Sequence, residues 1–136
     1  HPTAIRETLR ALRLRYPESR LWAVVEPRSN TLRRNVFEQE LVESLSLADE
    51  VILAAVYQAA NIPTGQILHP DRIVQALKNA GHSARQLPDV AAIIEHLNTY
   101  LRSGDIVAIL SNGGFDGIYE KLPKHLRSSR KSIVAP

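Results

Sequence analysis

Residues 21–31 read LWAVVEPRSNT, an unbroken apolar run of five residues followed directly by a polar stretch that contains Pro27. A short apolar run without alternation is typical of a strand buried on both faces of a parallel sheet. The same pattern recurs at 51–55 and 106–110, and a weaker strand is predicted at 83–87. These four segments predict the sheet on which the rest of the chain is built.

Apolar residues at helical spacing fill the segments between the predicted strands. One helix is expected to end before Pro17, and Phe37, Leu41 and Leu45 mark a second. A third is expected from Pro70 to Gly81, and a fourth follows Asp89 as its cap. A last short helix is expected to end at Pro123. This alternation predicts an α/β, Rossmann-like fold: one doubly wound, mainly parallel sheet with helices on both faces.

The composition of the 136 residues, 44% of them hydrophobic, favours one ordered domain. Without cysteine the chain can hold no disulfide, thiol nucleophile or thiolate metal site. The longest apolar run, 51–57, is far shorter than the roughly 20 residues of a membrane helix, so no membrane partner is expected. The chain begins with His1 and contains no methionine, so we expect it to be a piece of a longer protein, without a signal peptide at its start.

Basic residues gather at the end of the chain. The net charge is +3, but the five basic residues after Glu120 leave residues 1–120 with 12 basic against 14 acidic side chains. We therefore expect a domain over residues 1–123 and a basic, flexible tail over residues 124–136, with no nucleic-acid partner.

Three loops follow the ends of predicted strands, at 26–31, 56–61 and 111–117. Such loops line the ligand crevice of a doubly wound sheet. We place Arg28 at the start of a helix, where its guanidinium and free backbone N–H groups would suit a carboxylate or phosphate. The Ser, Asn and Thr at 29–31 are also ordinary helix caps, so both interpretations stay open.

The third loop carries Gly113-Gly114, which permits a tight turn, but it lacks the spacing of a dinucleotide fingerprint or a P-loop. Asp116 is suited either to cap a helix or to bind an amine, and Tyr57 either to fill the core or to contact a ligand. The five histidines show no metal-ligand spacing and no hydrolase motif is present, so no metal site is expected. The chain has the features of a binding domain and not of a complete enzyme.

Several stretches together resemble the carboxy-terminal domain of the Mur ligases: HPTAI at 1–5, EPRSNT at 26–31, ADEVIL at 48–53, VY at 56–57 and LSNGGFDGI at 110–118. The resemblance covers residues 1–122 and is greatest to the family's ligases of murein tripeptide. It implies peptidoglycan recycling in a bacterial cytoplasm, in which recycled L-alanyl-γ-D-glutamyl-meso-diaminopimelate is joined to UDP-N-acetylmuramate. ATP phosphorylates the sugar's carboxylate, the peptide amine attacks the acyl phosphate, and ADP and phosphate leave.

The resemblance assigns the first two loops to the peptide. Arg28, with Ser29, Asn30 and Thr31, would meet anionic groups of the peptide or of the acyl phosphate. Tyr57 would line the pocket of the amine substrate.

In the third loop, Ser111, Asn112 and Asp116 would hold the carboxylate and amine of that substrate. His1, which stands in the family's hinge motif, is assigned to the nucleotide. ATP and Mg²⁺ would be bound mainly by a preceding central domain, so no catalytic residue is expected here and the fragment alone is expected to be inactive. The alternative is a non-catalytic, flavodoxin-like binding module whose basic tail contacts a partner.

Overall fold

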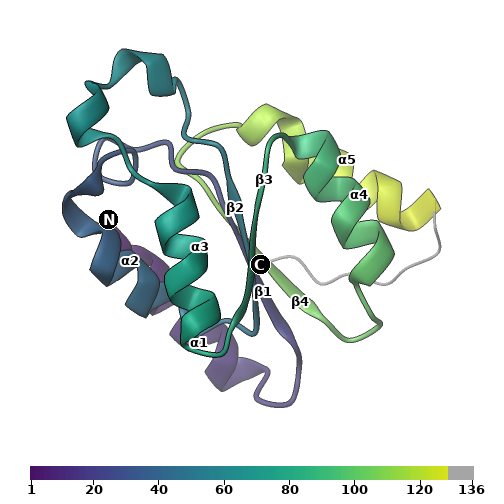
Figure 1. Ribbon diagram of the computed structural model, residues 1–136. Helices are drawn as coiled ribbons and strands as arrows, with labels where there is room; N and C mark the ends of the chain where they lie inside the picture. The colour runs from purple at the N-terminus through teal and green to yellow at the C-terminus, as the bar shows by residue number, and fades with distance from the viewer. Residues whose placement is uncertain (129–136) are drawn as a thin grey trace.

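The computed structural model describes residues 1–128, which form a central sheet between two layers of helices (Figure 1). The helices are α1 (Pro2–Arg15), α2 (Glu38–Leu45), α3 (Pro70–Asn79), α4 (Val90–Tyr100) and α5 (Ile118–Ser128). The strands are β1 (Leu21–Val25), β2 (Glu50–Ala54), β3 (Ser83–Leu87) and β4 (Ile106–Leu110). Four 3-10 turns connect them: η1 (Asn35–Phe37), η2 (Ala59–Asn61), η3 (Thr64–Gln66) and η4 (Phe115–Gly117).

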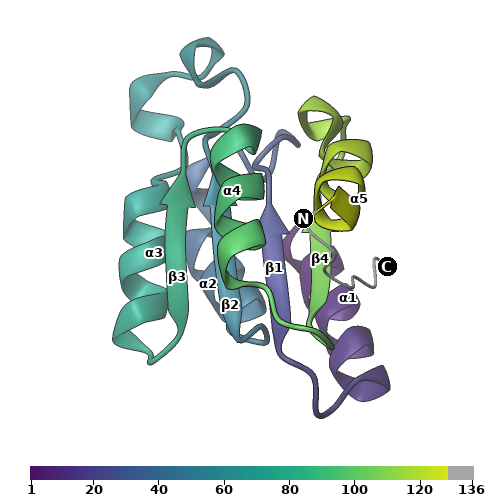
Figure 2. The same cartoon turned by 90° about the vertical axis from the view of Figure 1, so that its right-hand side faces the viewer.

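All strand pairs are parallel, in the order β3-β2-β1-β4. Helices α1, α2 and α3 cover one face of the sheet, and α4 and α5 cover the other (Figures 1 and 2). The predicted Rossmann-like, doubly wound sheet is confirmed. Within β1, Ala23 faces the first layer, whereas Trp22 and Val24 face the second. Because both faces of β1 are covered, its sequence shows no alternation.

Asp105 forms hydrogen bonds that stabilise the end of the sheet at which β1 and β4 begin. Its buried Oδ2 accepts hydrogen bonds from Arg20 Nη2 at 2.7 Å, Trp22 Nε1 at 2.9 Å and the Arg102 backbone N–H at 3.0 Å. Burial by itself would raise the pKa of Asp105, but these hydrogen bonds outweigh it and lower that pKa. The ionised carboxylate therefore stabilises the fold above its unfolded pKa of about 4, and this stabilisation is lost as the pH falls through the lowered value.

Helix α5 corrects the expected end of the domain. It continues through Pro123 to Ser128, because Ile118, Leu122 and Leu126 form a stripe that is buried against the sheet and α4. This burial offsets the backbone hydrogen bond that proline removes. The boundary expected between residues 123 and 124 falls inside the helix, and residues 129–136, the rest of the expected tail, lie outside the described residues.

Asp89 is confirmed as the cap of α4, since its Oδ1 accepts the Ala92 N–H at 2.8 Å. Replacing Asp89 with alanine should lower the free energy of unfolding by about 1 kcal/mol, because one N–H of the first turn loses its acceptor. Urea denaturation of the 136-residue chain measures this loss. Glu95→Ala, an exposed change on the same helix, is the control and should stay within about 0.5 kcal/mol; equal losses in both variants would contradict the capping role.

Candidate functional site

The order in which strands are added to the sheet reverses between β1 and β4. The chain passes from β1 to β2 and β3 on one side, then returns to add β4 on the other side of β1. The loops after β1 and β4 therefore diverge from neighbouring strand ends, where ligands of doubly wound sheets bind. Backbone hydrogen bonds join the loop after β1 to both neighbours. The Glu26 N–H donates to Leu110 O, at the end of β4, at 3.0 Å, and the Tyr57 N–H, in the loop after β2, donates to Pro27 O at 3.0 Å.

A buried carboxylate links the first and third loops. Ser111 Oγ donates to Glu26 Oε1 at 2.6 Å, and the Gly113 N–H donates to Ser111 Oγ at 3.1 Å. Glu26 is only 9% exposed. No role for Glu26 is predicted from the sequence. The available signal was a charged residue placed directly after an entirely apolar central strand.

Arg28 lies against this link. Its Nη1 is 3.8 Å from Glu26 Oε1, and its Cζ lies 3.7 Å from the centroid of the Tyr57 ring. The side chain also passes so close to Gly113 that a Cβ at that position would overlap its Nε, Cδ and Cζ atoms. Within residues 1–128 the guanidinium makes no hydrogen bond, although the side chain is only 29% exposed. Arg28 is thus held by charge and stacking, with its N–H donors free for an anion.

The other polar residues of the first loop stabilise a local turn. Ser29 Oγ accepts the Leu32 N–H at 3.2 Å, and Asn30 Oδ1 accepts Arg33 Nη2 at 3.0 Å. Thr31 contributes its carbonyl oxygen, which accepts the Arg34 N–H at 3.4 Å. Among the described residues, none of these three side chains makes a hydrogen bond with Arg28.

The expectation that this loop starts a helix is wrong. Residues 30–33 form a turn, Arg34 pairs with Ile67 in an isolated antiparallel bridge, and α2 begins only at Glu38. Because of this intervening turn and bridge, the N–H groups of a helix terminus are not beside Arg28. An anion there would depend on the guanidinium itself.

His1 and Asn112 lie at a separate small pocket of about 210 Å³, which Ser111 also lines. His1 caps α1, since its Nδ1 accepts the Thr3 N–H at 3.2 Å, and its ring lies 4.9 Å from that of Phe37. The apolar wall of the pocket comes from α1 and β4, through residues such as Ile5 and Ile109. This pocket brings the beginning of the chain to the third loop.

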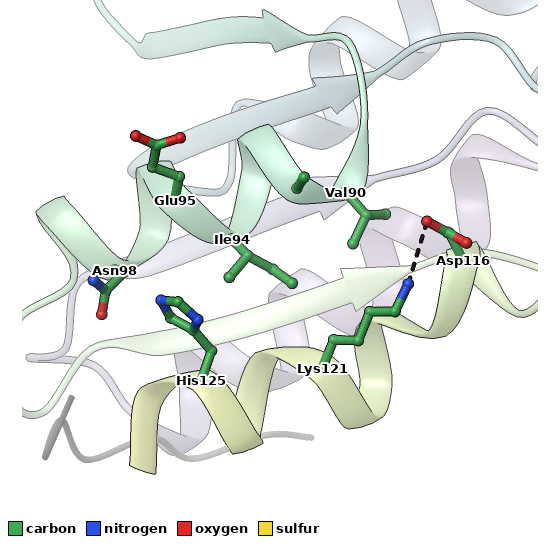
Figure 3. A pocket seen from close by; sticks show the side chains of 8 residues that line it. Val90, Ile94, Glu95, Asn98, Asp116, Lys121 and His125 are labelled. Carbon is green, nitrogen blue, oxygen red and sulfur yellow. Dashed lines mark ion pairs between the residues drawn. The ribbon is translucent and has the colours of Figure 1, made fainter. Parts of the chain in front are cut away.

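Asp116 lies apart from Arg28, at the mouth of a pocket of about 470 Å³ between α4 and α5 (Figure 3). Its carboxylate is 3.4 Å from Lys121 Nζ and 77% exposed. The backbone at Phe115 and Asp116 is left-handed, with φ of 46° and 47°, and this turn carries the Asp116 side chain over to α5. Among residues 1–128 the Asp116 carboxylate pairs with Lys121 and accepts no hydrogen bond from a helix N–H, so the structure does not support the capping alternative.

The described residues contain no group of three or more His, Asp or Glu side chains placed to hold a metal ion. Among residues 1–128 no helix is long and apolar enough to cross a membrane. The geometry around Arg28 suits the binding of an anionic group.

The sequence is similar to characterised ligases. A profile described as Mur ligase, glutamate ligase domain, matches residues 1–113. The UDP-N-acetylmuramate--L-alanyl-gamma-D-glutamyl-meso-2,6-diaminoheptandioate ligase of Escherichia coli strain K12 is 37% identical over 123 residues, covering 90% of this chain and 25% of that protein. A UDP-N-acetylmuramate--L-alanine ligase of Desulfitobacterium hafniense is 31% identical over 113 residues, covering 83% and 25%.

A solved structure gives the same result. The crystal structure of a murein peptide ligase from Psychrobacter arcticus superposes with a TM-score of 0.74 at 35% identity, over 93% of this chain and 25% of that one. The chain spans about a quarter of the length of the curated relatives it matches.

Proposed function

Because this chain belongs to the Mur ligase family of ATP-dependent ligases, as its glutamate ligase domain, we propose that it binds the amine substrate of a murein tripeptide ligase. The full-length protein would join the amine of L-alanyl-γ-D-glutamyl-meso-diaminopimelate to the carboxylate of UDP-N-acetylmuramate, in the recycling of bacterial peptidoglycan. The similarity to the Escherichia coli and Psychrobacter ligases supports the tripeptide as substrate.

One observation carries the proposal: Arg28 is fixed at the crevice between β1 and β4 while its N–H donors remain free. A planar guanidinium in this state can bind a carboxylate through two parallel hydrogen bonds. A tripeptide rich in carboxylates supplies such groups. Tyr57 would support the guanidinium from one side. Ser111 and Asn112, which line the pocket beside His1, stay proposed contacts of the same substrate.

ATP and Mg²⁺ would be held mainly by a central domain of the same protein. The described residues contain no cluster of three or more His, Asp or Glu side chains placed to hold a metal ion, and the sequence has no P-loop. When bound, ATP supplies the phosphoryl group that activates the sugar's carboxylate. His1, at the pocket beside Ser111, is the proposed contact of this chain with the nucleotide. The chain alone would form no amide bond, and the complete protein would act in the cytoplasm.

The amine substrate is tested in the full-length protein by release of phosphate from Mg-ATP in the presence of UDP-N-acetylmuramate. The reaction should depend on murein tripeptide and proceed far more slowly with L-alanine. Faster release with L-alanine would assign the domain to the other ligase type that it matches. If phosphate is released neither with murein tripeptide nor with L-alanine, the result would favour the non-catalytic binding module.

Asp116 stays the proposed partner of the peptide's amine, across from Lys121. Asp116→Asn removes the charge while keeping a residue type that tolerates left-handed backbone. Because the carboxylate is largely exposed, we expect only about a two- to fivefold rise in KM for tripeptide. Steady-state kinetics of the full-length protein measure it, with Glu120→Gln, another exposed carboxylate, as the control. An unchanged KM for tripeptide would remove Asp116 from the site.

A further inference from the structure

Glu26 is a buried carboxylate at the candidate site, and the proposed binding of peptide by Arg28 leaves it without a role. A buried charge is unfavourable unless it is paired and hydrogen-bonded. Glu26 meets both conditions at the junction of the two loops, through Ser111 and Arg28. Its charge also acts on Tyr119: burial first, and then the nearby Glu26 carboxylate, raise the pKa of that phenol.

The carboxylate of Glu26 is also held by residues other than Arg28. Ser111 Oγ donates to Glu26 at 2.6 Å and is itself fixed by the Gly113 N–H, while the backbone of Glu26 is bonded to Leu110. The Glu26 carboxylate therefore forms a fixed negative charge near the guanidinium of Arg28.

Arg28 lies 3.8 Å from that charge, which is attraction at a distance too long for a hydrogen bond. The Glu26 carboxylate and the Tyr57 ring together restrict the Arg28 side chain, which is long and otherwise has many rotamers. The restriction uses none of the N–H donors. A restricted side chain with unused N–H donors suits an arginine that is held in one orientation before an anion binds.

We propose that Glu26 is a positioning residue, which holds Arg28 in the orientation that binds a carboxylate of the incoming peptide and does not itself touch the substrate. The inference rests on the proposed function of Arg28. The opposite role would be competition, in which Glu26 draws Arg28 away from the substrate. The two roles predict opposite changes in KM.

The test is a double-mutant cycle in the full-length ligase, with Glu26→Gln, Arg28→Ala and the combination of the two. Glutamine keeps the shape of the side chain and an acceptor for Ser111 but removes the charge. We expect Glu26→Gln alone to raise the KM for tripeptide roughly three- to tenfold, with kcat and the KM for UDP-N-acetylmuramate nearly unchanged. In the Arg28→Ala background the same change should have almost no further effect on tripeptide kinetics.

Two variants complete the design. Glu26→Asp keeps the charge, so its KM for tripeptide should rise less than that of Glu26→Gln. If Glu26→Gln lowers Tm, Glu26→Asp replaces it in the double-mutant cycle with Arg28→Ala. Glu120→Gln removes an exposed carboxylate from the same end of the domain and controls for net charge. A lower KM in Glu26→Gln, an unchanged KM, or equal effects in both backgrounds would overturn the positioning role. If Arg28→Ala itself leaves tripeptide kinetics unchanged, the proposed function fails instead.

Discussion

Replacing Arg28 with alanine in the full-length ligase is expected to lower kcat/KM for murein tripeptide by about ten- to a hundredfold. One hydrogen-bonded contact with a charged group contributes about 1.5 to 3 kcal/mol, and Arg28 is placed to make such a contact with a peptide carboxylate. The KM for UDP-N-acetylmuramate should move much less. Steady-state kinetics with each substrate varied in turn measure both effects.

The stability of the Arg28→Ala variant serves as its control. Arg28 makes no hydrogen bond in the described residues, so Tm should change little. Arg28→Lys adds a second comparison, since lysine keeps the charge but loses the planar group that stacks on Tyr57, and it should restore activity only in part. Equal losses for both substrates, or a large fall in Tm, would indicate a structural role and contradict binding of the peptide.

Replacing Gly113 with alanine should reproduce much of that loss, about tenfold in kcat/KM for tripeptide, although no substrate contact is assigned to Gly113. A Cβ there would overlap the Arg28 side chain, which must then leave its place between Glu26 and the Tyr57 ring. Because a flexible side chain moves more easily than backbone, the free energy of unfolding should stay within about 0.5 kcal/mol.

Gly114→Ala is the matched control. Gly114 has a φ of −73°, and a Cβ at this position meets nothing within 4 Å, so alanine fits without strain. The comparison of the two variants in kinetics and thermal melts separates displacement of Arg28 from general stiffening of the loop. Equal activities of Gly113→Ala and the unmodified protein would show that Arg28 does not need its observed position.

Most of the sheet and part of the site could be predicted from the sequence. Buried parallel strands are apolar runs, so β1 and β4 were predicted at their observed bounds. Parallel strands also place their carboxyl ends at one edge of a sheet, so the loops that carry Arg28 and Ser111 were expected at the same edge, where both side chains contact Glu26. Tyr57 joined them because its loop follows β2, the other neighbour of β1.

Other features could not be predicted, because they depend on local backbone geometry. The turn after Ser29 and the pairing of Arg34 with Ile67 moved the start of α2 away from Arg28. The left-handed backbone at Asp116 directed its carboxylate to Lys121 and not to the crevice. Neither feature leaves a periodic pattern in the sequence.

The sequence by itself determined the layered α/β fold, the edge of the sheet at which the three loops lie and the basic residue available there, because hydrophobic periodicity and loop position are local properties. Only the tertiary structure decided how that residue is held. Arg28 is held by residues of three loops, Glu26, Tyr57 and Gly113, and Ser111 acts on it only indirectly, through a hydrogen bond to Glu26. The contacts between different loops arise only when β2 and β4 lie on either side of β1, since no spacing along the chain encodes them.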